Sequence, residues 1–295
     1  MFARPGLPTF DYVRPESADE VVRLLQEEGE GARLLMGGTD LLPGLRDGAF
    51  RPRLVIDVKG LPGMKVAAYD PDRGLTVGAA VTMNELARHQ QVQTHYPLLA
   101  QAAAAVASYQ VRNRATLGGN LCNASPCADT APTCLVLDAE LAILGPEGDR
   151  LLPAADFFLG PGRTALRPGE MLTAIHFPPS PAGNAARYLK LGRCRTGDLS
   201  LVGVAVLGYP DGGRGKYQFR IGLGSVAPTP IRAAEAEAYL EEHPVGEEAL
   251  AAAAERAMAA ANPISDVRGT AKYQRAMVRT LTLRGLREVW EKLPT

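Results

Sequence analysis

The chain has 295 residues, of which 46% are hydrophobic and 22% are charged, so it can bury a substantial core and is long enough for two compact units. Its 32 basic residues balance its 32 acidic residues, which argues against nucleic acid or an anionic membrane as the main partner. The apolar runs are far shorter than the roughly 20 residues of a membrane-spanning helix, and the N-terminus lacks a signal-peptide pattern. We therefore expect a cytoplasmic protein with no membrane span and no nucleic-acid partner.

The first part of the chain predicts alternating helices and strands. Ser17 can cap a helix over residues 18 to 26, because its hydroxyl can accept an N–H group of the first turn. The apolar residues 32 to 36 and the β-branched segment 54 to 58 favour strands. This order is typical of a βαβ-like unit. A hairpin around residues 70 to 74 is expected next, because apolar and polar positions alternate on both sides of it.

The middle of the chain predicts helices separated by a long loop. Residues 96 to 109 are rich in alanine and favour a helix. Residues 111 to 124 are dense in glycine and asparagine and predict a loop. Asp129 can cap a short helix with Pro132 near its first turn, and residues 140 to 144 then favour a strand.

A cluster of prolines, serine, glycine and asparagine over residues 178 to 184 indicates a linker. It divides the chain into units 1–178 and 184–295. The second unit is expected to place strands first and alanine-rich helices after them. The expected strands cover residues 187 to 191, 199 to 209 and 217 to 225, and the expected helices cover 231 to 240, 247 to 261 and 271 to 292.

Three of the four cysteines, Cys122, Cys127 and Cys134, lie close together in the sequence, a grouping that can mark a metal site. No C-x-x-C pair occurs, no histidine is near, and Cys134 sits in an apolar run, so the spacing favours reduced thiols over a metal or cluster. The role of these three residues stays open.

A glycine pair follows the first apolar strand. Gly37 and Gly38 separate the strand from Thr39, Asp40 and a helical segment. Consecutive glycines allow close approach of the backbone, so that their N–H groups can converge on a diphosphate. The alternative is a tight turn in which the glycines supply unusual dihedral angles alone.

A second glycine pair, Gly118 and Gly119, lies between Thr116 and Asn120. These hydroxyl and amide groups can donate to phosphate or to the edge of a flavin. The chain contains neither G-x-G-x-x-G nor G-x-x-x-x-G-K-[ST], which disfavours a Rossmann cofactor and a nucleotide-hydrolysing site.

The two glycine motifs together resemble the FAD-binding medium subunit of the xanthine dehydrogenase and carbon monoxide dehydrogenase family. The resemblance rests on Met-Gly-Gly-Thr-Asp-Leu at residues 36 to 41, Thr-Leu-Gly-Gly-Asn at 116 to 120, and Ala-Ser-Pro at 124 to 126 followed by Asp129. It implies an α+β fold. An FAD-binding domain of the vanillyl-alcohol-oxidase (PCMH) type, in two α/β subdomains, would precede a C-terminal domain with a three-stranded antiparallel sheet and a helical bundle.

The resemblance also implies which residues bind the cofactor. The two glycine motifs would wrap the FAD diphosphate, and Asp129 would lie near the ribityl or adenosine end. Lys190 near the flavin pyrimidine edge would favour the anionic reduced ring, whereas without the resemblance it is a solvated strand lysine. No catalytic or metal-binding residue is expected. The cofactor-binding set is Arg33, Leu34, Leu35, Met36, Gly37, Gly38, Thr39, Asp40, Thr116, Leu117, Gly118, Gly119, Asn120, Asp129, Leu172 and Lys190.

Two features separate this chain from some relatives of the family. The inserted cysteine-bearing loop that holds an iron–sulfur cluster in 4-hydroxybenzoyl-CoA reductases is absent. The histidines lie outside both glycine motifs, so FAD is expected to be bound non-covalently. By the resemblance, the loop that contains Asp198 matches a variable family segment that can lie near the flavin. Asp198 is not part of the predicted cofactor-binding set. The four histidines are His89, His95, His176 and His243.

The function implied by the resemblance is electron relay. A large molybdopterin-binding subunit would oxidise the substrate, a small [2Fe–2S] subunit would carry single electrons, and FAD on this chain would collect two and pass them to an external acceptor. A dimer of heterotrimers is expected. Two alternatives stay open, a stand-alone flavin oxidoreductase of the same fold and a non-catalytic assembly subunit. The substrate and the acceptor, whether NAD, quinone or dioxygen, also stay open.

Overall fold

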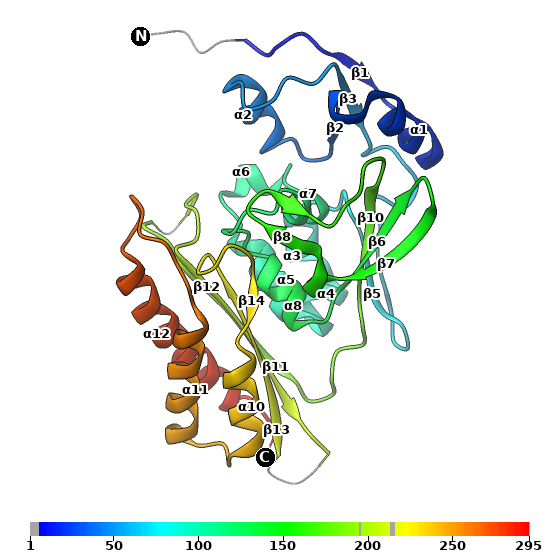
Figure 1. Ribbon diagram of the computed structural model, residues 1–295. Coiled ribbons are helices and arrows are strands. Elements are labelled where there is room, and N and C mark those ends of the chain that lie inside the picture. Colours follow the sequence, from blue (N-terminus) through cyan, green and yellow to red (C-terminus); the bar gives the residue numbers. More distant parts are fainter. Residues whose placement is uncertain (1–5, 195, 213–215, 295) are drawn as a thin grey trace.

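The computed structural model describes residues 6–194, 196–212 and 216–294. Figure 1 shows three parts: a small sheet with helices close to the N-terminus, a larger sheet with helices in the middle, and a third sheet covered by the last helices. Within these described ranges, no helix has both the length and the hydropathy that crossing a bilayer requires.

The first part is a parallel sheet with the order β1-β3-β2, in agreement with the βαβ-like unit expected from the sequence. Ser17 caps α1 as predicted, because its hydroxyl accepts the N–H of Glu20. Strand β2 runs directly into the first glycine pair. The elements are β1 (Asp11–Val13), α1 (Ala18–Glu28), the 3₁₀ helix η1 (Gly29–Gly31), β2 (Ala32–Leu35), α2 (Leu41–Arg46) and β3 (Leu54–Asp57).

The second part is an antiparallel sheet with the order β4-β5-β10-β6-β7. The expected hairpin is formed by β4 and β5. The strands are β4 (Ala67–Asp70), β5 (Gly74–Gly78), β6 (Glu140–Gly145), β7 (Gly148–Pro153) and β10 (Met171–Phe177), with a separate ribbon of β8 (Phe158–Gly160) and β9 (Arg163–Thr164). The helices are α3 (Met83–Arg88), α4 (Gln90–His95), α5 (Pro97–Ala105), α6 (Tyr109–Arg112), α7 (Leu117–Cys122), α8 (Ala131–Val136) and α9 (Ala154–Phe157).

The helix expected over residues 96 to 109 is interrupted in the structure. Helix α5 ends at Ala105 and α6 begins at Tyr109. The break has a local cause, because Ala107 adopts φ +41°, a left-handed conformation that a right-handed helix cannot continue. Ser108 then caps α6 by accepting the N–H of its third residue.

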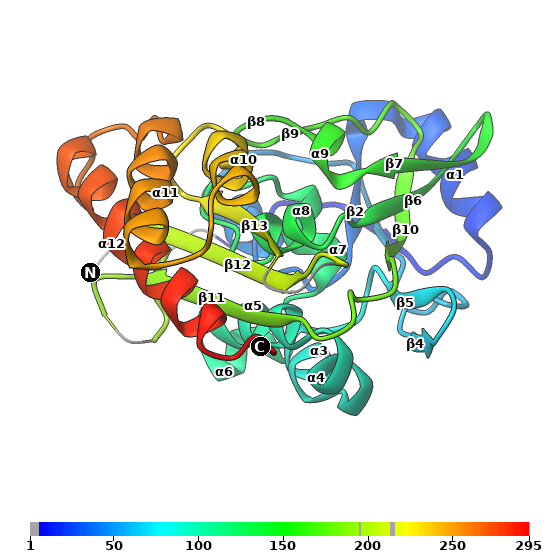
Figure 2. The same cartoon turned by 90° about the horizontal axis from the view of Figure 1, so that it is seen from below.

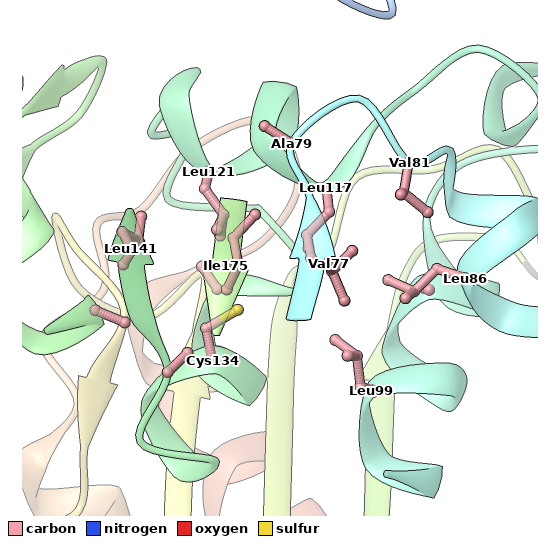
Figure 3. Close-up of a cluster of buried hydrophobic side chains, with 14 of the residues drawn as sticks. Val77, Ala79, Val81, Leu86, Leu99, Leu117, Leu121, Cys134, Leu141 and Ile175 are labelled. Carbon is pink, nitrogen blue, oxygen red and sulfur yellow. The ribbon is translucent and has the colours of Figure 1, made fainter. Parts of the chain in front are cut away.

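The segment 111 to 124, expected as a loop, is partly helical. Thr116 caps α7, because its hydroxyl accepts the N–H of the third helical residue. Figure 3 shows Leu117 and Leu121 of this helix packed beside the sheet residues Val77 and Ile175. The prediction of a loop rested on the glycine content. A helix forms there because Thr116 caps it and two of its leucines are buried.

The third part is an antiparallel sheet with the order β11-β12-β13-β14. Its three long strands are those expected, and the short strand β14 adds a fourth at the edge where a helix was expected to begin. Ile231 pairs with Leu223 there, so the following helix starts later. The elements are β11 (Ala185–Leu191), β12 (Val202–Pro210), β13 (Tyr217–Gly224), β14 (Ile231–Arg232), α10 (Ala234–Glu242), α11 (Glu247–Ala260) and α12 (Ala271–Trp290).

This third sheet is covered on both faces (Figure 2). Along β12, Val204 and Val206 belong to the core shared with α10 to α12, whereas Ala205 and Leu207 belong to the core of the second part. Successive strand residues point to opposite faces. By the same alternation, Tyr188 and Lys190 of β11 share one face.

Candidate functional site

A cleft of about 640 Å³ is lined by residues of β2, α2, α6, α7 and the loop before α8. This volume falls within the range of small-molecule and cofactor sites, about 300–1,000 Å³. Most of the predicted residues line it. Those that do are Arg33, Leu34, Met36, Gly37, Gly38, Thr39, Asp40, Thr116, Gly119, Asn120, Asp129 and Leu172.

Four predicted residues do not line the cleft. Leu35 pairs with β3 in the first sheet, and Leu117 is fully buried in the core. A Cβ atom on Gly118 would lie 2.6 Å from the Cβ of Ala79, so this glycine permits close packing. Lys190 is held behind the cleft by Asp129.

The first glycine motif offers unpaired backbone donors to the cleft. Among the described residues, the N–H groups of residues 37 to 40 have no hydrogen-bond acceptor. Gly38 adopts φ +73°, a conformation that favours glycine. A Cβ on Gly37 would collide with the carbonyl oxygen of Arg114, so Gly37 lets the two motifs approach each other. A run of unpaired N–H groups with a left-handed glycine is the arrangement of an anion-binding nest.

The first backbone N–H groups of α7 in the second glycine motif already have acceptors within the protein. The N–H of Leu117 donates to the carbonyl of Val81 at 3.0 Å, and that of Gly118 donates to Ala79 at 2.9 Å. The N–H of Gly119 donates to the Thr116 hydroxyl at 3.1 Å. These three N–H groups are therefore paired in this structure, in contrast to those of the first motif.

The second motif presents the side-chain amide of Asn120 to the cleft. Its Oδ1 accepts the hydroxyl hydrogen of Thr130 at 2.6 Å. This contact orients the amide, whose NH₂ group has no acceptor among the residues that the structure describes. An amide NH₂ carries two donors. The cleft therefore has backbone donors on one wall and a fixed amide donor on another.

Asp129 does not cap a helix, in contrast to the sequence-based expectation. The N-cap of α8 is Thr130, and the Asp129 carboxylate turns toward the third sheet. Its Oδ1 accepts the hydroxyl hydrogen of Tyr188 at 2.8 Å, and its Oδ2 accepts from Lys190 Nζ at 2.8 Å. Tyr188 and Lys190 of β11 fix this orientation of the carboxylate. The residues next to Asp129 in the sequence do not predict it.

Asp129 is largely buried and its carboxylate is shared by two partners. The residue is 5% exposed, and burial raises the pKa of its carboxyl, an effect that the nearby Lys190 ammonium partly offsets. The pKa of Tyr188 is raised as well, by burial and by the negative charge of Asp129. Gly203 makes room for the phenol, because a Cβ there would lie 2.8 Å from its oxygen.

Lys190 is therefore neither solvated nor free in this structure. Its Nζ donates to Asp129 and, at 3.0 Å, to the carbonyl of Ala105. A lysine ammonium has three donors, so these contacts use two of them. The side chain ties the third sheet to both α5 and the loop before α8.

Several cleft residues were missed by the sequence-based prediction. Most of them come from loops, while Leu41, Val111 and Cys122 belong to α2, α6 and α7. Leu41 and Ser125 stand in the motifs that carry the resemblance, but these motifs alone assign them no role. Phe50 has a visible partner, since the guanidinium of Arg33 lies 5.6 Å from its ring centre. The missed residues are Leu41, Phe50, Val106, Ala107, Val111, Ala115, Cys122, Asn123, Ser125, Cys127, Ala128, Gly162, Leu166, Gly197, Asp198 and Leu199.

A bidentate ion pair supports the cleft wall around Leu166. Both nitrogens Nε and Nη2 of Arg150 donate to the Glu170 carboxylate at 2.7 Å. Nη2 also donates to the carbonyl of Ala165 at 2.9 Å. The hydrogen bonds from Arg150 hold the pKa of Glu170 below its usual value.

This pair predicts an acid-dependent stability. A carboxyl whose pKa is lower in the folded state stabilises the fold above its unfolded pKa of about 4.5, and this contribution is lost as the pH falls through the folded pKa. Glu170→Gln should lower the free energy of unfolding at neutral pH by about 1–3 kcal/mol. The gap between the variant and the wild type should narrow toward about pH 3.5. Denaturant titrations of both proteins between neutral pH and about pH 3.5 test this prediction. A difference in the free energy of unfolding that does not change with pH would contradict it.

Comparison with known proteins places these features in a family. Residues 8–180 match the family of the FAD binding domain in molybdopterin dehydrogenase. The chain belongs to this family. Residues 187–289 match the C-terminal domain of CO dehydrogenase flavoprotein. The chain is therefore an oxidoreductase subunit of this kind, and the fold class expected from the sequence is confirmed.

Individual relatives cover almost the whole chain. The carbon monoxide dehydrogenase medium chain of Hydrogenophaga pseudoflava is 35% identical over 97% of this chain and 98% of its own length. The xanthine dehydrogenase FAD-binding subunit of Escherichia coli O157:H7 is 33% identical over 94% of each. Among solved structures, carbon monoxide dehydrogenase from Hydrogenophaga pseudoflava has a TM-score of 0.94 at 36% identity and covers 98% of this chain and 100% of that chain.

Proposed function

We propose that this chain binds FAD non-covalently in the cleft and transfers electrons through it. The observation that carries the proposal is the run of unpaired N–H groups at residues 37 to 40, which lie in one cleft with the amide of Asn120. Backbone donors of this kind suit a diphosphate. The apolar side chains elsewhere in the cleft, such as Leu172 and Val111, suit a flat aromatic ring.

Different residues of the chain would bind different parts of FAD. The first glycine motif would hold the diphosphate through backbone N–H groups, and Thr116 would keep α7 in place as its cap. Asp129 would lie near the ribityl or adenosine end of the cofactor, with Lys190 fixed behind it. Since Lys190 does not line the cleft, it would act on the bound cofactor by fixing the Asp129 carboxylate.

We also propose that the chain works inside a complex. A large molybdopterin-binding subunit and a small [2Fe–2S] subunit would be its partners, arranged as a dimer of heterotrimers. The support is that relatives over nearly the full length are named as a medium chain and as an FAD-binding subunit of such dehydrogenases. When bound, FAD would take single electrons from the clusters and pass them on in pairs to an external acceptor.

Two separate units would carry these roles. Strand β10 ends at Phe177 and β11 begins at Ala185, and the two family matches divide between residues 180 and 187. These observations support the proposed units 1–178 and 184–295. The contacts of Tyr188 and Lys190 with Asp129 support a contribution of the second unit to the cofactor site.

Purification of the full chain with an affinity tag from the cells that produce it tests the complex. The expected preparation contains two further subunits, molybdenum, and the visible spectrum of [2Fe–2S] clusters together with FAD. Rapid mixing of the reduced complex with NAD, a quinone or dioxygen then identifies the acceptor from the rate of flavin reoxidation. A chain that retains FAD, carries no partner and oxidises a substrate alone would contradict the proposal.

A further inference from the structure

The C-terminal end of α5 is closed in an unusual way. The last carbonyls of a helix lack partners within the helix, and glycine in a left-handed conformation commonly closes it. Here side-chain cations bind the carbonyl of the last helical residue and the two carbonyls that follow it. Nη1 of Arg112 donates to the carbonyls of Val106 at 2.8 Å and Ala107 at 3.2 Å, while Lys190 donates to that of Ala105. Three successive carbonyls are thus bound by two cations.

The turn that these cations hold is strained and lies in the cleft. Ala107 adopts φ +41°, which is unfavourable for a residue with a Cβ atom and persists where the surroundings enforce it. Both Val106 and Ala107 line the cleft. The loop of the second unit rests on the same turn, because Gly197 donates its N–H to the carbonyl of Ala107 at 3.2 Å.

Arg112 is itself fixed from behind by a buried amide. Its Nε donates to Oδ1 of Asn84 at 3.1 Å, and Asn84 is 7% exposed. The Nδ2 of Asn84 donates in turn to the carbonyl of Tyr109 at 3.0 Å and to Oδ1 of Asn113 at 2.6 Å. A planar guanidinium can bridge the amide and the two carbonyls at once, which a lysine ammonium at the end of a flexible stem does less well.

We propose that Arg112 is a positioning residue for the flavin ring. It does not line the cleft, but it holds the Val106–Ala107 turn, whose two residues are part of the apolar lining of the cleft. The N–H of Ala107 has no acceptor among the described residues, so the fixed turn also leaves a backbone donor for the edge of the ring. The inference rests on the proposed function, because it assumes that the cleft holds FAD.

The test compares three variants of the full chain with the wild type. Arg112→Met removes the donors and keeps much of the stem, Arg112→Lys keeps the charge, and Arg88→Met is the matched control. Arg88 lies on α3 with its guanidinium 5.1 Å from the ring centre of Tyr109 and is outside the cleft lining. The dissociation constant for FAD, the absorption bands of the bound flavin and its midpoint potential are measured for each.

Arg112→Met should weaken FAD binding by about tenfold or more and shift both the absorption bands and the midpoint potential. For Arg112→Lys, the FAD affinity, absorption bands and midpoint potential should lie between those of Arg112→Met and the wild type. For Arg88→Met, all three should equal those of the wild type. If Arg112→Met does not fold, Arg112→Lys carries the same comparison. Wild-type affinity, spectrum and potential in a folded Arg112 variant would overturn the positioning role alone, whereas a wild-type chain that binds no FAD would overturn the proposed function.

Discussion

Replacing Asp129 with alanine should lower the free energy of unfolding by about 3 kcal/mol, because the Lys190 ammonium would lose the carboxylate that compensates its charge in a largely buried position. Tyr188 would lose its acceptor as well. The exposed pair Arg23–Glu27 on α1 serves as a control, and Glu27→Ala should change stability by less than about 1 kcal/mol. Denaturant unfolding at neutral pH measures both.

Removing the other partner should give a loss that depends on pH. Lys190→Met leaves Asp129 buried without a cation, so the folded pKa of its carboxyl rises further above the unfolded value. A group with a raised folded pKa favours folding at low pH, and this contribution is lost as the pH increases through that pKa. Lys190→Met should therefore be less destabilised at about pH 5 than at about pH 8. The double variant with Asp129→Ala should lose less stability than the two single losses added together, and simple additivity would contradict the pairing.

Gly119→Trp should abolish FAD binding, with a loss of affinity of at least about 100-fold, corresponding to roughly 3 kcal/mol. Gly119 lines the cleft, and the nearest atom to an added Cβ is the Thr116 hydroxyl at 2.8 Å. The indole must then enter the cleft. The fold should survive, because a helical glycine is replaced by a better helix former at the expense of one cap worth about 1 kcal/mol.

Control substitutions separate cleft filling from loss of structure. Gly246→Trp adds the same side chain where no atom lies within 4 Å of the new Cβ, so it should bind FAD as the wild type does. Gly118→Ala forces a clash with Ala79 and should destabilise the fold. Normal FAD affinity in a folded Gly119→Trp chain would exclude the cleft as the cofactor site.

The sequence predicted the local features of the site well, because they depend on neighbouring residues. The strand that ends at Leu35, the glycine pair after it and the cap at Ser17 all follow from composition and spacing over a few positions. The resemblance added Asp129 and Leu172, and both line the cleft. Their roles toward FAD stay predictions.

What the sequence did not reveal depends on contacts between distant segments. Asp129 looked like a helix cap, yet Tyr188 and Lys190 of a strand some sixty positions later turn its carboxylate away from the helix. Ala107 reads as one more alanine in a helical run, yet it is left-handed, and its carbonyl accepts from Arg112 and from Gly197 of the second unit. The helix propensity of neighbouring residues predicts neither the orientation of the Asp129 carboxylate nor the conformation of Ala107, because tertiary contacts override it.

Titration of the purified full chain with FAD, followed by absorbance and by analysis of the flavin released on denaturation, tests the cleft assignment most directly. We expect about one FAD per chain, released intact because the cofactor is held non-covalently, and no binding by Gly119→Trp at the same concentrations. A folded wild-type chain that binds no FAD, alone or with its partner subunits present, would contradict it.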